Sequence, residues 1–150
     1  MRAMSERCRF AHVGMTVKSI SDTIGFYSRY FGFKVIEQGS FPPGFFDMKL
    51  QLYRVEGLMS DYAFIESPDG VVIELFEFSP QTEFKDAVWN TPGYHHICLY
   101  VKDLEECYKE MKADGLDVNY FFAPEAMDPK GVHHWVFLKD PDGNMIELQD

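Results

Sequence analysis

The chain has 150 residues, of which 46% are hydrophobic and 25% are charged, and these values exclude a disordered or a fibrous protein. The formal net charge is −10, because 24 Asp and Glu outweigh 14 Lys and Arg. Such a chain repels phosphate backbones, so we expect no nucleic-acid partner.

The first predicted module covers residues 10–78. It opens with a β-rich run at residues 12–17, which ends at a polar break. A helix is predicted over residues 21–31, because apolar side chains recur there every three or four positions, and Gly32 suits its C-terminal end. A strand is predicted over residues 33–37.

A loop at residues 39–44, rich in Gly and Pro, follows this strand. Phe41, Phe45 and Phe46 accompany the loop and could either cover a pocket or simply pack against the core. A hairpin then closes the module, with its turn at residues 67–70, where Pro and Gly stand at favoured positions.

Residues 79–93 form a predicted linker to the second module, residues 94–150. The elements predicted in this module are a strand, a helix, a strand and a hairpin turn, at residues 96–101, 103–114, 118–122 and 140–143. Its helix has a capping-box-like start at Asp103 and Glu106 and is closed by Gly115.

The two modules are copies of one another. Residues 12–20 match residues 96–104, and residues 62–75 match residues 135–148 with seven of fourteen positions identical. The shift between the copies changes along the chain, which places an excess of about ten residues in the first copy, within residues 37–61. The sequence therefore predicts an α+β fold, a single domain of two β-α-β-β-β modules.

The cysteines argue for a reducing compartment. Cys8, Cys98 and Cys107 leave one thiol unpaired under any pairing and form no CxxC motif, as is typical of a cytoplasmic protein. The first eight residues contain no apolar stretch, so we expect no secretory signal. No apolar run approaches the roughly 20 residues that span a bilayer, so we expect no membrane segment.

Each copy carries a histidine at the start of its first strand and a glutamate in its last strand: His12 and Glu74, then His96 and Glu147. A carboxylate within an apolar strand is unfavourable unless it is paired or bound to a metal. A single strand Glu is more often exposed, and a single strand His more often satisfied, than either is a ligand. The recurrence of both residues favours the metal interpretation.

Two modules related by a pseudo-two-fold axis would bring these four side chains to one centre. Two imidazoles and two carboxylates suit one divalent ion, and Zn, Ni, Co, Mn and Fe all remain open. Four protein ligands leave two positions of an octahedral ion for neighbouring oxygens of a substrate.

The chain resembles the vicinal oxygen chelate superfamily. This superfamily includes glyoxalase I, methylmalonyl-CoA epimerase, extradiol dioxygenases, and fosfomycin and bleomycin resistance proteins. The likeness spans residues 10–148 and is carried by six segments, at residues 12–20, 26–27, 31–33, 92–97, 101–104 and 140–147. It implies paired modules that form a half-open mixed β-barrel around a metal site.

Within the superfamily, the filled set of four ligand positions is similar to bacterial glyoxalase I, lactoylglutathione lyase. Epimerases usually carry Gln where Glu74 stands, yet the segment of residues 93–97 looks like theirs. Glyoxalase I commonly has an Arg in its first strand that helps to hold glutathione. Thr16 stands there in this chain, which makes Thr16 a candidate for contact with substrate.

The four candidate ligands, two histidines and two glutamates around one metal ion, predict an enzyme that abstracts a proton next to a carbonyl group. The metal would bind two vicinal oxygens of a small-molecule substrate, and a carboxylate would remove the C–H proton to give an enediolate. Glu147 is the first candidate for this base and Glu74 the second. Reprotonation on another carbon gives glyoxalase chemistry, and reprotonation on the opposite face gives epimerisation.

Other polar residues are candidates for substrate contact. Tyr100 shares a strand face with His96, so it could line a pocket or pack in the core. His134 would share that face if Val136 opposes Glu147 in the last hairpin; a solvent-exposed position is the alternative. His95 should point away from the site, and the role of His133 is open.

Two other functions stay open: an Fe(II) extradiol-type dioxygenase that uses the extra histidines as acid–base groups, and a non-catalytic binding or resistance protein. The presence of all four candidate metal ligands argues against both of these functions. We also expect a homodimer, and modules could exchange between its chains, so the sequence leaves open whether the site lies within one chain or across two.

Overall fold

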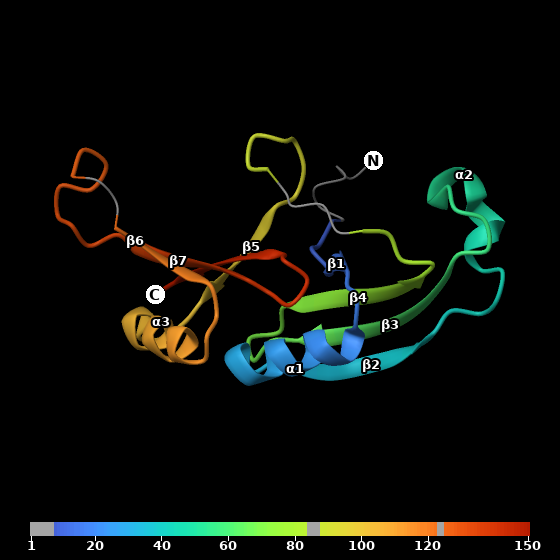
Figure 1. The fold of residues 1–150 in the computed structure, drawn as a ribbon, viewed down its shortest axis with the longest axis horizontal. Helices are drawn as coiled ribbons and strands as arrows, with labels where there is room; N and C mark the ends of the chain where they lie inside the picture. The colour runs from blue at the N-terminus through green and yellow to red at the C-terminus, as the bar shows by residue number, and fades with distance from the viewer. Residues whose placement is uncertain (1–7, 84–87, 123–124) are drawn as a thin grey trace. The chain divides into compact units, whose positions relative to one another are not determined.

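The computed structural model describes residues 8–83, 88–122 and 125–150, which belong to two compact units, Met1–Glu83 and Phe84–Asp150. Each unit holds one four-stranded mixed sheet, and the elements follow the order β-α-β-β-β in both (Figure 1). The predicted α+β class is therefore confirmed. Residues 1–7 of the N-terminal segment and residues 84–87 of the predicted linker lie outside the described part.

The first unit contains a sheet with the strand order β1-β4-β3-β2, in which β1 runs parallel to β4 and the other pairs are antiparallel. Helix α1 packs on one face of this sheet, against β2, β3 and β4. The elements are β1 (Val13–Thr16), α1 (Ile20–Phe31), β2 (Lys34–Ser40), the 3₁₀ turn η2 (Phe46–Lys49), α2 (Leu50–Tyr53), β3 (Met59–Glu66) and β4 (Val72–Ser79).

Helix α1 has the ends that its sequence predicts. The Ser19 hydroxyl accepts a hydrogen bond from the Asp22 amide at 3.2 Å, which caps the first turn. Gly32 follows in the left-handed region with φ of 69° and donates to the Ser28 carbonyl, as predicted. The face between these ends buries Tyr27 and Thr23 completely.

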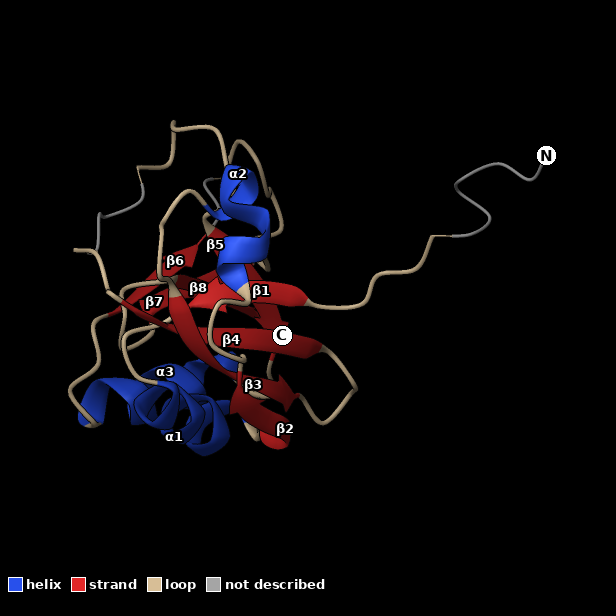
Figure 2. Cartoon of the chain, turned by 90° about the vertical axis from the view of Figure 1, so that its right-hand side faces the viewer, coloured by secondary structure: helices blue, strands red, loops and turns tan. Residues whose placement is uncertain are grey.

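The excess residues of the first copy form η2 and α2. Figure 2 shows this segment and α1 on opposite sides of the first sheet. Phe46 is its anchor, because its side chain is only 2% exposed and contacts Tyr53 and Phe78 edge to face. The insertion predicted within residues 37–61 is thus a folded part of the first unit.

The second unit repeats the arrangement with the strand order β5-β8-β7-β6, β5 being parallel to β8. Helix α3 packs against β6 and β7. The elements are β5 (His96–Tyr100), α3 (Leu104–Ala113), β6 (Val118–Phe122), β7 (His134–Lys139) and β8 (Met145–Gln149). None of the helices in the described ranges has the length and apolar character needed to cross a membrane.

The predicted capping box at the start of α3 is wrong. Asp103 adopts the left-handed region with φ of 58°, and its side chain makes no capping hydrogen bond. The Leu104 amide instead donates to the Asp150 carboxylate at 3.2 Å. In the first unit the Ile20 amide donates to Glu77 of β4 at 2.8 Å, so in each unit a carboxylate in or directly after the last strand caps the helix start.

Both hairpins turn where the sequence predicts, but the register of the second differs by one residue. Phe137 opposes Glu147, and Val136 opposes Leu148. The turn is closed by a hydrogen bond from the Asp140 amide to the Asn144 carbonyl, 2.9 Å long. The loop that separates the strands therefore ends one residue later than we expected, which moves every side chain of β7 to the other face.

Candidate functional site

In the first unit, β1 and β4 bring His12 and Glu74 together. Glu74 lies on β4 opposite Gly14, and His12 immediately precedes β1 on the same side. His12 Nε2 is 2.9 Å from Glu74 Oε2, and the two side chains are 39% and 16% exposed. The imidazole also contacts the Phe64 ring edge to face, at 5.5 Å between centroids. Both side chains of the pair are therefore partly accessible to a ligand.

The second unit contains the same pair at the equivalent place. Glu147 lies on β8 opposite Cys98 of β5, and His96 begins that strand. His96 Nε2 is 3.1 Å from Glu147 Oε2. The four predicted ligands are therefore brought together in two pairs, one in each unit.

Within the described part of either unit, no third His, Cys, Asp or Glu side chain joins these pairs to complete a group that could hold a metal ion. Each pair supplies one imidazole nitrogen and one carboxylate. A complete site needs at least one further ligand, so the meeting of the two pairs at one ion stays a prediction.

The surroundings of the two glutamates differ. Glu147 Oε1 accepts a hydrogen bond of 2.8 Å from the side-chain amide of Gln149, two residues along β8. The equivalent neighbour of Glu74 is Phe76, which cannot donate. Burial and the charge of Glu147 raise the pKa of the Cys98 thiol, so this thiol stays protonated near neutral pH.

His95 does not point away from His96, and this expectation is corrected. The two rings stack with centroids 4.8 Å apart, and their Nδ1 atoms are 2.7 Å apart, within hydrogen-bond distance. His95 precedes β5, so the alternation of strand side chains does not apply to it. Trp89 packs on both rings, at 4.3 Å from His95 and 5.3 Å from His96. These contacts leave His96 Nε2 facing Glu147.

His134 does not lie on the strand face of Glu147, because of the shifted register. It pairs with Phe122, and its Nδ1 is hydrogen bonded to the Tyr120 hydroxyl. Its Nε2 lies 2.9 Å from Asp150 Oδ1. His134 therefore belongs to the polar contacts that fasten the end of the sheet, although it still borders the cavity described next.

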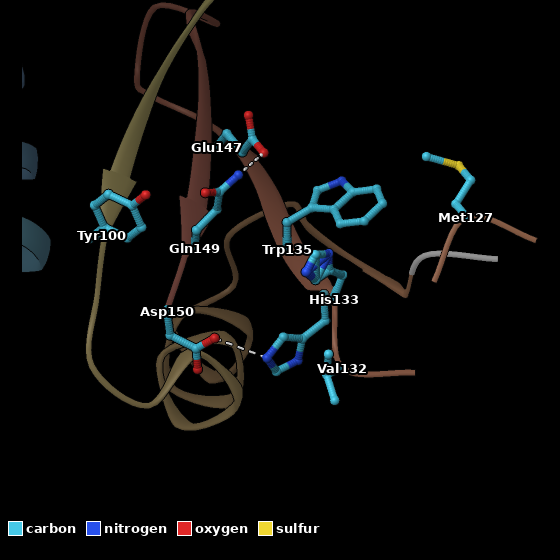
Figure 3. Close-up of a pocket in the computed structure, with 9 residues that line it drawn as sticks. Tyr100, Met127, Val132, His133, Trp135, Glu147, Gln149 and Asp150 are labelled. Carbon is cyan, nitrogen blue, oxygen red and sulfur yellow. Dashed lines mark hydrogen bonds and ion pairs between the residues drawn. The ribbon is translucent and has the colours of Figure 1, made fainter. Parts of the chain in front are cut away.

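A cavity of about 500 Å³ lies beside Glu147 in the second unit (Figure 3). Figure 3 shows Glu147 and Gln149 on β8, with Tyr100 on the neighbouring strand β5. Tyr100, 84% exposed, thus lines a pocket and is not part of the core. The lining residues are Tyr100, Met127, Val132, His133, His134, Trp135, Glu147, Gln149 and Asp150.

A second cavity, of about 540 Å³, lies beside Glu74 in the first unit. It contains Thr16 and all three phenylalanines predicted either to cover a pocket or to pack. The lining residues are Gly14, Met15, Thr16, Phe41, Phe45, Phe46, Tyr53, Glu74, Phe76 and Phe78. Our sequence reasoning missed Phe76 and Phe78 as pocket residues, although strand alternation from Glu74 could have identified both.

Comparison with known proteins gives one family for nearly the whole chain. A sequence profile described as the Glyoxalase/Bleomycin resistance protein/Dioxygenase superfamily matches residues 9–148. A lactoylglutathione lyase of Pseudomonas putida is 28% identical over 154 residues, which cover 93% of this chain and 83% of that protein. A lactoylglutathione lyase of Schizosaccharomyces pombe is 26% identical over 91% of this chain, which spans only 45% of the length of that relative.

Solved structures agree on the fold. A trypanothione-dependent glyoxalase I of Leishmania major has 25% identity and a TM-score of 0.66, over 95% of this chain and 86% of that one. A glyoxalase family protein of Bacillus cereus has 20% identity and a TM-score of 0.69, over 93% and 91%. The fosfomycin resistance protein FosX of Listeria monocytogenes, complexed with Mn(II) and dihydroxypropylphosphonic acid, has 17% identity and a TM-score of 0.63, over 94% and 90%.

Proposed function

Because the chain belongs to the Glyoxalase/Bleomycin resistance protein/Dioxygenase superfamily, we propose that it is a metal-dependent lyase or isomerase that removes a proton next to a carbonyl group. The observation that carries this proposal is the recurrence of one His–Glu pair at the same place in both units, at 2.9 and 3.1 Å. In this proposal His12, Glu74, His96 and Glu147 together hold one divalent ion.

The residues fit such an ion by chemistry and by spacing. Bonds of about 2.1 Å to a nitrogen and an oxygen at right angles separate these two atoms by about 3 Å. Both His–Glu pairs have this separation already. Two imidazoles and two carboxylates suit Zn, Ni, Co, Mn or Fe, whereas a site for Ca or Mg would contain oxygen ligands alone.

The ion, when bound, would polarise the substrate oxygens and stabilise the negative charge that develops on them. Glu147 is the proposed base, because its carboxylate borders a cavity large enough for a substrate and is oriented by Gln149. Glu74 borders the other cavity and could take the proton from the opposite face of the substrate. A base must come within hydrogen-bond reach of the proton that it removes.

The destination of the proton distinguishes the candidate reactions. Return of the proton to the neighbouring carbon gives a reaction of the glyoxalase I type, and return to the opposite face of the same carbon gives an epimerase. The names of the relatives and the glutamate at position 74 favour the glyoxalase I type.

The test combines metal analysis of the purified protein with exchange of solvent deuterium into candidate substrates. Hemithioacetals, 2-oxo acids and thioesters are screened, and wild type is compared with Glu147→Gln. We expect stoichiometric Ni, Co or Zn and exchange that the variant loses. Ferrous iron with oxygen uptake would instead indicate a dioxygenase, and tight binding without exchange would indicate a binding protein.

A further inference from the structure

We propose that the cavity of the first unit binds an uncharged aryl or branched alkyl group of the substrate. The part of the substrate that enters this cavity is then apolar, and it is not a carboxylate such as those of glutathione. This inference rests on the proposed function, because Glu74, one of the four proposed ligands, forms part of the cavity wall.

The walls of the cavity consist mainly of aromatic rings, of which Phe41, Phe76 and Phe78 lie nearly parallel. The rings of Phe76 and Phe78 are within 5° of parallel, and those of Phe41 and Phe76 within 10°. Phe45 packs against Phe41 with centroids 4.8 Å apart. A flat apolar group gains from packing on ring faces and edges of this kind. A volume of about 540 Å³ is ample, since an apolar cavity of about 150 Å³ already admits benzene.

The first repeat alone places an aromatic wall beside one of the proposed ligands, among the described residues. A second aromatic cavity, of about 420 Å³, lies in the second unit and is lined by Trp89, Phe121, Trp135 and Phe137 among others, but none of the four proposed ligands lines it. The inserted segment supplies Phe45, Phe46 and Tyr53, and the buried Phe46 holds the wall in place through its contacts with Phe41 and Tyr53. The cavity beside Glu147 in the second unit is lined instead by polar side chains such as His133 and Gln149. The insertion thus makes the cavities beside the two glutamates unequal, with an aromatic one beside Glu74 and a more polar one beside Glu147.

The charge of the residues that line this cavity disfavours the binding of an anionic group. Among the described residues that line this cavity, Glu74 is the only charged one. Moving a carboxylate into apolar surroundings without a partner is strongly unfavourable, and the negative charge of Glu74 adds repulsion. Thr16 contributes a hydroxyl where the family resemblance implies an arginine. The two carboxylates of glutathione therefore find no cation here, whereas an uncharged group does not need one.

The experiment measures binding of three probes to the full chain after removal of metal with a chelator. Acetophenone carries a neutral aryl group, 4-acetylbenzoate adds a carboxylate to the same ring, and acetone lacks the ring. Binding is followed by chemical-shift changes in NMR spectra. We expect acetophenone to bind at least tenfold more tightly than either of the other probes.

Substitutions locate the binding. Phe45→Asn should weaken acetophenone binding about fivefold, because it removes one ring from the wall. Leu52→Asn, in the same insertion but 67% exposed, is the matched control and should leave binding unchanged. Thr16→Arg should raise the affinity for 4-acetylbenzoate severalfold, because it places a cation at the wall. The far-UV circular dichroism spectrum of each variant reports whether it folds.

Equal binding of acetophenone and 4-acetylbenzoate to wild type would overturn the inference, as would unchanged binding in folded Phe45→Asn together with no gain in Thr16→Arg. These measurements need neither metal nor turnover. Deuterium exchange without aryl binding therefore refutes the inference alone, and aryl binding without metal or exchange refutes the proposed function alone.

Discussion

The side-chain amide of Gln149 donates a hydrogen bond of 2.8 Å to Glu147 Oε1, while Oε2 of the same carboxylate faces His96. The carboxylate is thus held from both sides. Its counterpart Glu74 has no such amide two residues along its strand, because Phe76 stands there. The two repeats therefore present the same pair of side chains with unequal support.

Replacing Gln149 by Leu should weaken metal binding by about tenfold or more, because a hydrogen bond that orients a ligand contributes to affinity. Calorimetric titration of the metal-free protein with Co or Zn measures the change. Phe76→Leu is the control at the equivalent position of the other repeat and should bind metal as wild type does. Similar affinities for wild type and Gln149→Leu would show that this hydrogen bond does not support the ligand.

His96→Ala and Glu147→Ala should each abolish stoichiometric metal binding and activity, while the far-UV circular dichroism spectrum stays that of wild type. Each change removes one donor from a partly exposed pair and leaves the core intact. His133→Ala is the control, because His133 lines the same cavity but is not one of the four proposed ligands. Stoichiometric metal in both ligand variants would remove the basis of the assignment.

Glu147→Gln should speed alkylation of Cys98. Burial and the charge of Glu147 both raise the pKa of this thiol, so neutralising the carboxylate lowers the pKa and increases the thiolate fraction at a given pH. Labelling by iodoacetamide at pH 8, followed by mass spectrometry of the Cys98 peptide, should accelerate about two- to fivefold. The rate at Cys107, whose neighbouring charges include Glu110, should not change. Equal alkylation rates of Cys98 in wild type and Glu147→Gln would show that the charge of Glu147 does not act on this thiol.

The two aspartates at the start of α3 should respond in opposite directions. Asp150→Ala should lower the free energy of unfolding by about 1 kcal/mol, because Asp150 accepts from the Leu104 amide. Asp103→Gly should raise it by about 0.5–1 kcal/mol, because Asp103 makes no cap and is strained at φ of 58°. Urea unfolding measures both values. A lower free energy of unfolding in Asp103→Gly would instead indicate that the Asp103 side chain stabilises the helix start.

Most of the fold could be predicted from local signals in the sequence. Helix periodicity located α1, and the Pro-Asp-Gly turns located both hairpins. The repeat also identified His12, Glu74, His96 and Glu147 as candidate ligands, because they recur at equivalent places in the two copies. The order of elements and the identity of these candidates can be read along the chain, whereas their arrangement as one His–Glu pair in each unit is a finding of the structure.

The remaining features required the tertiary structure. The register of β7 and β8 depends on where the hairpin loop closes, and a slip of one residue moved His134 to the opposite face from Glu147. The caps from Glu77 and Asp150 join residues 57 and 46 positions apart. The aromatic cavity likewise combines an insertion with strand residues distant in sequence. Sequence patterns describe which side chains share a face of one element, whereas contacts between elements are decided by packing in three dimensions.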